Sequence, residues 1–216
     1  MTTQAGGQTS GQARLRRDTA RTRDRLVAAA GVLLAERGPT FSLPELARAA
    51  GVATATAYRH FADVHEAFGE FYLRLAEELA SELAAVPPEV RGLDRFERMG
   101  SRWVALAAGW GRAATQMRSP AGFLERVRAQ DPVTSALHAV LAPVVRELVG
   151  DGVCPEQDVD YAVLVWVTLF DERVVVDLLA LGWSPGEVAA HLERSVLGAL
   201  GATRAPASRP TGRPAR

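Results

Sequence analysis

Residues 51–61 read GVATATAYRHF, an order of small, hydroxyl-bearing and basic side chains that is suited to contacts with nucleic acid. Large apolar residues are nearly absent before Phe61, so most of this segment is not core. Threonine can donate or accept hydrogen bonds at base edges, and its methyl group can contact thymine. Tyrosine, arginine and histidine can hold phosphate oxygens. These residue types predict a short helix that places a thin face in the major groove of duplex DNA.

Further candidates for contacts with DNA lie on the N-terminal side of this segment. The N-terminus of a preceding helix offers free N–H groups beside Thr40 and Ser42, which predicts a phosphate seat. An arginine-rich arm over residues 14–25 could enter a minor groove or lie along phosphates, and the alternative is a solvated helix face. The predicted DNA-binding residues are Arg16, Arg17, Thr40, Ser42, Thr54, Thr56, Tyr58, Arg59 and His60.

Two short helices separated by a glycine-containing turn should position these side chains. Ser42 is suited to cap a helix, and Glu45 at the third helical position completes a capping box, so a helix is predicted over about 43–50. Gly51 can adopt the positive φ that the following turn requires. The pattern predicts a helix-turn-helix motif over about 42–61.

The rest of the chain also reads as helices. One is predicted over about 19–37, and a long one with a single apolar stripe begins near Asp63. Further helices follow, among them one from about 156 to 181 and a last one from about 184 to 200. The stretch VLVWV alone could be a strand, but no turn-spaced partner strands exist. The predicted fold class is all-α, with about nine helices: an N-terminal three-helix helix-turn-helix domain followed by a C-terminal antiparallel helical bundle.

Composition and charge narrow the class of protein. The 216 residues are 48% hydrophobic and carry no net charge, but residues 1–60 carry +5, residues 61–201 carry −9 and residues 202–216 carry +4. A basic end beside an acidic body favours a polyanionic partner, although charge blocks of this size also arise by chance. No apolar N-terminal segment or membrane-length apolar run is present, which predicts a soluble, cytoplasmic protein without membrane contact.

Sequence features of enzymes and metal proteins are missing. The chain has no glycine-rich phosphate loop, no HExxH motif and no serine-centred elbow, so no catalytic residue is predicted. Its single cysteine, Cys154, excludes an internal disulfide and a cysteine-based zinc cluster, and its histidines lack metal-ligand spacing. We therefore predict no metal and no cofactor.

The helix-turn-helix segment resembles the N-terminal domain of the tetracycline-repressor (TetR) family of transcriptional regulators. By this match, Thr54, Thr56, Tyr58 and His60 fall at positions that contact DNA in the family. Val64 stands where family members often carry lysine, and the arginines of the arm could offset that loss. Ala57 stands where a larger aliphatic residue is common. The matching residues are Arg25–Ala30, Gly38, Ser42–Ala47, Ala50–Val52 and Tyr58–Phe61.

The resemblance implies a homodimer whose C-terminal part binds a small effector and thereby changes the spacing of two DNA-reading heads. The predicted organisation is a mobile basic arm (1–18), a DNA-binding domain (19–79), an effector-binding and dimerisation domain (80–201) and a disordered Arg/Pro tail (202–216). The predicted function is a dimeric repressor released by its effector from a near-palindromic double-stranded DNA operator. The alternative is a helical ligand-binding protein or enzyme that does not bind DNA specifically.

Aromatic and sulfur-containing side chains outside the helix-turn-helix could line an apolar effector pocket, although for each one singly core packing is the alternative. Asp171 interrupts an apolar helix and could bind a cationic or hydroxylated effector, pair with an arginine or lie at a dimer edge. The predicted dimerisation elements are the last two helices, the final one with a stripe of Val188, Leu192, Val196 and Ala199. The predicted effector-binding residues are Trp103, Trp110, Met117, Phe123, Trp166, Phe170 and Asp171.

Overall fold

The computed structural model of the chain describes residues 6–116 and 119–202, and all regular elements in these ranges are helices. They comprise ten α-helices and one 3₁₀ helix, close to the nine helices expected. In chain order the elements are α1 (Gly6–Arg37), α2 (Leu43–Ala49), α3 (Thr54–His60), α4 (Val64–Ala84), α5 (Gly92–Trp110), η1 (Gly111–Gln116), α6 (Phe123–Arg128), α7 (Pro132–Gly150), α8 (Val159–Leu169), α9 (Glu172–Ala180) and α10 (Pro185–Ala199).

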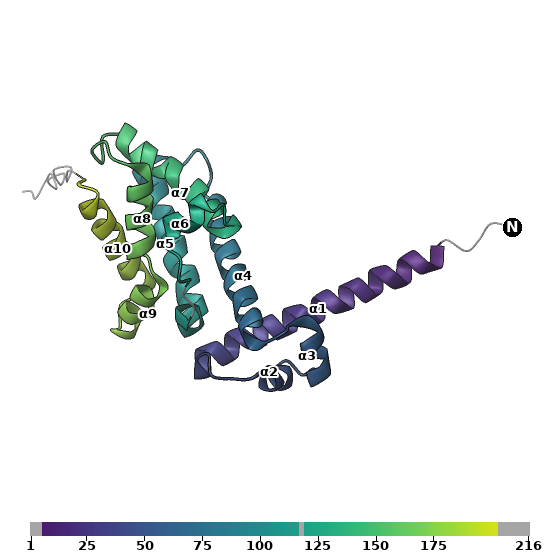
Figure 1. Cartoon of the computed structure of the whole chain (residues 1–216). Coiled ribbons are helices and arrows are strands. Elements are labelled where there is room, and N and C mark those ends of the chain that lie inside the picture. Colours follow the sequence, from purple (N-terminus) through teal and green to yellow (C-terminus); the bar gives the residue numbers. More distant parts are fainter. Residues whose placement is uncertain (1–5, 117–118, 203–216) are drawn as a thin grey trace, which may run out of the picture.

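The helices form two parts joined by α4. Figure 1 shows α1, α2 and α3 at one end of the molecule, which we call the head, and α5 to α10 gathered beside one another, which we call the bundle. The start of α4 packs against α1 in the head, and its later turns pack against α5 and α7 in the bundle. The expected domain boundary between residues 79 and 80 therefore falls inside one continuous helix.

Each part has its own apolar core. In the head, Leu26 and Leu34 of α1 pack with Leu46, Phe61 and Phe68 into one buried cluster. The bundle core is larger. Its members include Phe96, Met99, Trp103, Leu141, Leu148, Trp166 and Phe170. Three members of the predicted dimerisation stripe, Val188, Leu192 and Val196, are buried in this core, so they are not available to a second subunit.

The predicted helix-turn-helix is confirmed in its details. Ser42 is the N-cap of α2 and has extended backbone angles. Its N–H donates a hydrogen bond to the Glu45 carboxylate at 2.8 Å, which completes the capping box. Gly51 has φ of +64°, the left-handed conformation that the turn between α2 and α3 was expected to need. Asp63 then caps α4 by accepting a hydrogen bond from the Glu66 N–H.

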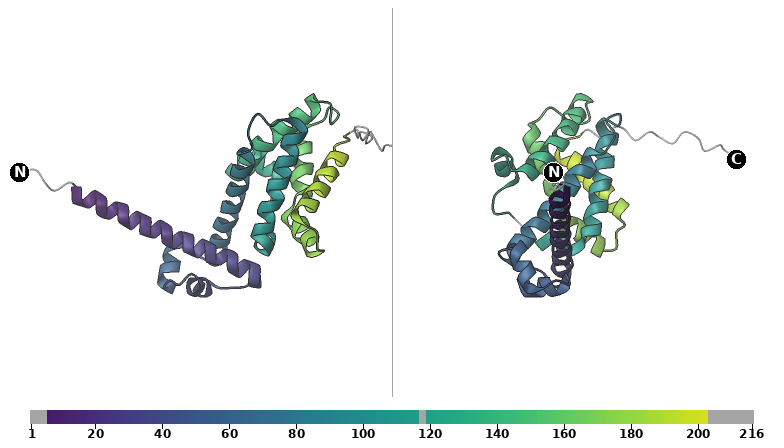
Figure 2. Two further views of the ribbon diagram at one scale, coloured as in Figure 1. Left: turned by 180° about the vertical axis from the view of Figure 1, so that it is seen from behind. Right: turned by 90° about the vertical axis from the view of Figure 1, so that its right-hand side faces the viewer.

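The first helix begins earlier than expected. Helix α1 starts at Gly6 rather than near Thr19, so the described residues of the predicted mobile arm, 6–18, are helical. Glutamine, alanine and arginine are good helix formers, and extending an existing helix avoids the cost of nucleation. Figures 1 and 2 show this first half of α1 projecting away from the rest of the molecule.

The long helix expected over 156–181 is divided in two. Helix α8 ends at Leu169, and α9 begins at Glu172 with Asp171 as its N-cap. The Asp171 carboxylate accepts a hydrogen bond from the Arg173 N–H at 2.9 Å, which stabilises the new helix start. The periodicity of apolar residues did not reveal this break, because both sides of it are apolar. The predicted disordered tail, apart from Ala202, lies outside the described residues.

Helix α7 is the one helix in the described ranges that is long and apolar enough to cross a membrane by length and composition alone. It packs against α4, α5, α6 and α8, and its residues Leu141, Val144, Val145 and Leu148 are in the bundle core. This position is typical of the central helix of a helical bundle.

Candidate functional site

Helix α3 presents most of its predicted DNA-binding side chains outward. Thr54, Tyr58 and Arg59 are exposed, and Tyr58 has 55% of its surface accessible although it is a large aromatic residue. Ala57 on the opposite side is fully buried, so the head core closes over α3 without the larger aliphatic residue expected there. The thin, hydroxyl-bearing face predicted from the sequence is therefore a surface of the folded head.

Within α3, Arg59 and Thr56 bind one another. The Arg59 guanidinium donates a hydrogen bond to the Thr56 hydroxyl at 2.8 Å, one helical turn away. His60 is half-buried at the end of the helix. Thr54, Tyr58 and Arg59 are thus the most exposed of the residues predicted on α3, whereas the Thr56 hydroxyl is already bound by Arg59.

The predicted phosphate seat at the start of α2 contains a carboxylate. Both the Ser42 N–H and the Ser42 hydroxyl donate to Glu45 at 2.8 Å, and the Thr40 hydroxyl donates to the Arg37 carbonyl at 3.2 Å. The hydrogen bonds from Ser42 lower the pKa of Glu45, so its negative charge persists at this position. This arrangement does not favour a phosphate at Ser42, and it corrects the role expected for that residue.

The arginines of the first helix divide into two groups. Arg14, Arg16, Arg17 and Arg21 are exposed along the projecting part of α1. Arg25, closer to the body, donates from one Nη2 to the carbonyls of Ala50 at 2.6 Å and Gly51 at 3.0 Å. Part of the predicted DNA-contacting arm thus holds α1 to the turn of the helix-turn-helix.

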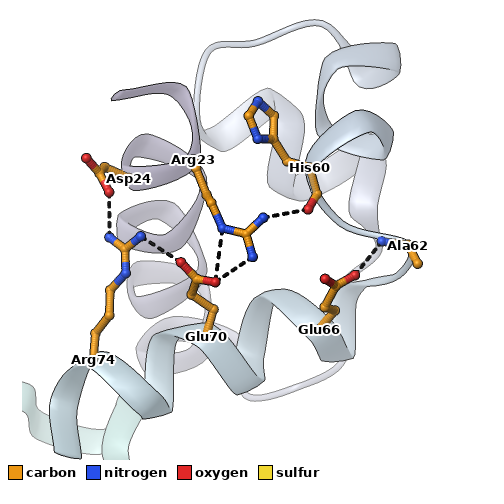
Figure 3. A network of polar contacts seen from close by, with 7 residues as sticks. All are labelled: Arg23, Asp24, His60, Ala62, Glu66, Glu70 and Arg74. Carbon is orange, nitrogen blue, oxygen red and sulfur yellow. Dashed lines mark hydrogen bonds and ion pairs between the residues drawn. The ribbon is translucent and has the colours of Figure 1, made fainter. Parts of the chain in front are cut away.

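Arg23 is the centre of a polar network that joins α1, α3 and α4 (Figure 3). Its guanidinium donates to one Glu70 oxygen at 3.0 and 2.5 Å and to the His60 carbonyl at 2.8 Å. The same guanidinium lies 4.4 Å from the centre of the Phe61 ring, within cation–π range. Arg23 therefore fixes the C-terminal end of α3 to both neighbouring helices.

Glu70 carries this network to the outer surface. Its second oxygen accepts from Arg74 at 2.7 Å, and Arg74 in turn binds Asp24 at 2.8 Å (Figure 3). The hydrogen bond from Arg23 is the main cause that lowers the pKa of Glu70 to about 2. Reasoning from the sequence missed Arg23 and Glu70 as positioning residues. The spacing did contain a clue, because Arg23 lies three and seven residues before the buried Leu26 and Ala30, on the same helix face.

A cavity of about 390 Å³ lies in the bundle beside α4. The predicted residues Trp103, Trp110, Phe123 and Asp171 line it, whereas Met117 lies outside the described residues. Other walls come from α4, α6, α7, α8 and α9. Their lining residues include Tyr72, Leu75, Leu79, Arg126, Leu137, Val167, Glu172 and Arg173.

Trp166 and Phe170 do not line this cavity, contrary to expectation. Both are fully buried, and the Trp166 ring packs against Phe96 with centroids 4.5 Å apart. Phe170 packs against Trp103 with centroids 5.5 Å apart, one layer behind the cavity wall. Their aromatic rings fill the core, which was the alternative for each residue singly.

Polar side chains occupy one side of the otherwise apolar cavity. Asp171 is bound by the Arg173 guanidinium through charge-assisted hydrogen bonds, so the pairing with an arginine weighed above is found. Burial raises the pKa of Glu172 and that of Tyr72. Within residues 6–116 and 119–202, no three His, Cys, Asp or Glu side chains lie close enough together to hold a metal ion.

Comparison with known proteins agrees with this geometry. Residues 26–63 match the sequence profile of the bacterial regulatory proteins of the tetR family, and these residues include the whole helix-turn-helix. A search of curated proteins gave no match.

Solved structures share the fold over most of the chain. The fatty acid degradation regulator FadR from Bacillus halodurans superposes with a TM-score of 0.66 at 18% identity, covering 84% of this chain and 97% of that one. A TetR-family protein from Vibrio parahaemolyticus has a TM-score of 0.60 at 27% identity, covering 81% and 96%. The regulator RolR, solved with resorcinol bound, has a TM-score of 0.53 at 18% identity, covering 87% and 91%.

The profile match covers the helix-turn-helix, and the superposed structures cover 81–87% of this chain. The exposed face of α3 lies within the segment that the profile matches. Residues 26–63 are thus similar to the bacterial regulatory proteins of the tetR family, and the chain shares its fold with solved structures described as TetR-family transcriptional regulators.

Proposed function

We propose that this regulator binds a near-palindromic operator as a homodimer in the cytoplasm and is a repressor that leaves the DNA when a small molecule fills the bundle cavity. The observation that carries the proposal is the position of α4. Its residue Glu70 holds the head network, and its residues Tyr72, Leu75 and Leu79 line the cavity. Occupancy of the cavity and the orientation of α3 therefore depend on the same helix.

On DNA, α3 is the element that reads the major groove. Thr54 at the exposed N-terminal end of α3 is suited to hydrogen bonds at base edges, and Tyr58 and Arg59 are suited to phosphate oxygens. Two symmetric heads require half-sites about one helical turn of DNA, roughly 34 Å, or a multiple of that distance apart.

The exposed arginines of α1 extend this basic surface. Arg14, Arg16, Arg17 and Arg21 have no role in the head core, which leaves them available for phosphates. Each phosphate contact that is lost should reduce the dependence of log affinity on log salt by about one. Deleting residues 1–17 should therefore lower this slope, and an unchanged slope would remove the arm from the interface.

The dimer surface is expected on α8 and α9, since the apolar stripe of α10 is buried in its own bundle. Tyr161 and Val174 are exposed on these two helices, and Leu181 at the end of α9 is 74% exposed. Exposed large apolar side chains on two consecutive helices favour a protein partner. Light scattering at micromolar concentration should give the mass of two chains, and Leu181→Glu should reduce it.

Binding of upstream DNA by the purified protein tests the proposal directly. Fluorescence anisotropy should show specific binding without ligand, with Tyr58→Ala weakening binding to all duplexes and Thr54→Ala changing preference at particular bases. Tyr58→Phe is the matched control, because it keeps the ring and removes only the hydroxyl. Equal affinity for upstream and random duplex at moderate salt would contradict the proposal.

Release of the protein from DNA by a ligand tests the second half of the proposal, the role of the effector. A ligand that binds the DNA-free form better should lower operator affinity by a factor that corresponds to about 1–3 kcal/mol of coupling. RolR, a structural relative, was solved with the small aromatic molecule resorcinol, which supports a cavity of this kind as an effector site. Thermal shift with a ligand library, followed by anisotropy with each hit, should identify compounds that stabilise the protein and weaken DNA binding together.

A further inference from the structure

Arg126 on α6 is a cation at the wall of the cavity, and among the described residues it has no ion-pair partner. It lines the cavity, and its Nε is buried with no hydrogen-bond partner in the described part of the chain. No carboxylate of the described residues lies within ion-pair distance of its guanidinium. The charge of Arg126 acts on Asp131, where it helps to lower the pKa. The Asp131 carboxylate already accepts hydrogen bonds from the Thr134 N–H at 2.9 Å and the Thr134 hydroxyl at 2.8 Å.

A second donor at the cavity wall is also unsatisfied. Trp103 is only 2% exposed, and its indole Nε1 has no partner among the described residues. An indole N–H and a guanidinium N–H can donate but cannot accept, so both groups require an acceptor atom from a partner. A buried donor without an acceptor is costly, and a ligand oxygen that met it would remove that cost.

The acidic groups of the cavity do not offset this excess of donors. The Asp171 carboxylate is held by Arg173, which donates from Nε at 2.8 Å, and it also caps α9. Burial raises the pKa of Glu172, which favours its neutral form, and a neutral carboxyl can itself donate. The Tyr72 hydroxyl, whose pKa burial also raises, stays protonated. Acceptors for a cationic ligand are therefore scarce.

The remaining walls define the body of the ligand. Many of them are apolar or aromatic, among them Trp110, Phe123, Leu79, Leu137 and Val167, and the hydroxyl-bearing residues Thr115, Ser119 and Thr168 complete the lining. The volume of about 390 Å³ is at the lower end of the range for sites that bind small organic molecules. A body of one or two rings fits such a space between aromatic side chains.

We propose that the effector is an organic acid: an apolar body of one or two rings held by the aromatic walls, with a carboxylate that accepts hydrogen bonds from Arg126. This inference rests on the proposed function because it uses the same cavity, but it concerns only the chemical class of the ligand. A carboxylate on the partly buried guanidinium of Arg126 forms charge-assisted hydrogen bonds, which are stronger than those of a neutral amide. Trp103 offers a further donor to a second oxygen on the ring.

A series of matched probes tests the inference by calorimetry on the full-length protein. The one-ring series is benzoate, benzamide and benzylammonium, and the two-ring series is 2-naphthoate, 2-naphthamide and 2-naphthylmethylammonium. The acid should bind about tenfold or more tightly than the amide in at least one series, and the ammonium should bind most weakly. Tighter binding of the amide or ammonium, or failure of both acids to bind, would overturn the inference.

Two arginines on α6 make the test residue-specific. Arg126→Gln should reduce the preference for acid over amide to below about threefold, whereas Arg128→Gln, at an exposed position on the same helix, should keep it. Arg126→Met provides a second variant if the glutamine destabilises the fold, which melting curves would show. A preference that survives both Arg126 variants would assign acid binding to another group.

DNA binding without any probe, measured in parallel, separates the two proposals. If the protein binds its operator but shows no preference for the acids, the ligand class is wrong and the regulator function stands. If it binds acids with the expected dependence on Arg126 but does not recognise DNA, the ligand class stands and the operator model fails.

Discussion

In the head, polar side chains that leave the solvent bind one another, whereas in the bundle several do not. Arg23, Glu70 and Arg74 form one connected set of hydrogen bonds with partners in the head. Within the described ranges, every buried side-chain nitrogen or oxygen without a partner lies in the bundle. These atoms belong to Arg95, Trp103, Arg126, Trp166 and Glu193.

The difference follows the tasks of the two parts. A fully bonded network has one favourable arrangement, which suits a helix that must meet DNA in a fixed orientation. Unsatisfied buried groups raise the free energy of the ligand-free bundle, and a partner that satisfies them gains that free energy on binding. The hydrogen bonds of the head therefore favour one structure, and under the proposed function the unsatisfied groups of the bundle favour a change on ligand binding.

The largest effect should come from removing the centre of the head network. Arg23→Ala deletes the bonds to Glu70 and the His60 carbonyl together with the contact on Phe61, so we expect a loss of about 2–3 kcal/mol in unfolding free energy. Urea denaturation measures this loss. Arg21 is exposed and lies two residues before Arg23 on the same helix. Arg21→Ala should therefore change the unfolding free energy by less than about 0.5 kcal/mol.

Lowering the pH should reduce the difference in unfolding free energy between the wild type and Arg23→Ala. The pKa of Glu70 is about 2 in the folded protein against an ordinary value of 4.5, so its contribution is complete above pH 4.5 and disappears as the pH falls towards 2. The gap between the wild type and Arg23→Ala should narrow over this window. A constant gap from pH 6 to pH 2.5 would show that the ion pair contributes little.

The bundle should respond to pH in the opposite direction. Glu193 is 9% exposed, and burial together with the nearby charge of Glu97 raises its pKa to about 7. The folded protein therefore favours the protonated form, and this stability is present below pH 4.5 and disappears as the pH rises through 7. Glu193→Gln should stabilise the protein by about 1–2 kcal/mol at pH 8 and by little at pH 4.5.

Melting temperatures of this variant at the two pH values provide the measurement. Glu77→Gln on α4 is the matched control, because Glu77 is exposed and should change stability only slightly at either pH. A Glu193→Gln variant that melts lower than the wild type at pH 8 would show that the carboxylate has a partner in solution.

The smallest effect is expected at the turn of the helix-turn-helix. Gly51 has φ of +64°, and a Cβ atom there would lie 3.0 Å from the Arg25 Nη2. Gly51→Ala should therefore cost about 1–2 kcal/mol and weaken DNA binding through a shift of α3. Gly109→Ala in α5, where no atom lies within 4 Å of the added carbon, should be neutral or slightly stabilising.

The head could be predicted from the sequence because its determinants are local. The capping pair Ser42 and Glu45 lies within one helical turn, and Gly51 marks the reversal directly. Each of these signals acts over a few residues, so no knowledge of the remaining chain was needed to place α2 and α3.

The site in the bundle could be predicted only in part, because its members meet through packing of distant segments. Tryptophan suits both a cavity wall and a core, and composition does not distinguish Trp103 from Trp166. Tyr72, Arg126 and Glu172 were missed for the same reason, since their positions at the cavity depend on how α4, α6 and α9 pack.

Helix α4 spans 21 residues without interruption, a length of roughly 30 Å at 1.5 Å per residue. Such a rod acts as a lever, so a tilt of about 10° at its bundle end would carry its other end about 5 Å. One base-pair step of DNA is only about 3.4 Å, so this swing would put a pair of recognition helices out of phase with their half-sites. On the proposed function, a small wedge in the cavity would therefore release DNA while every bond inside the head stays intact.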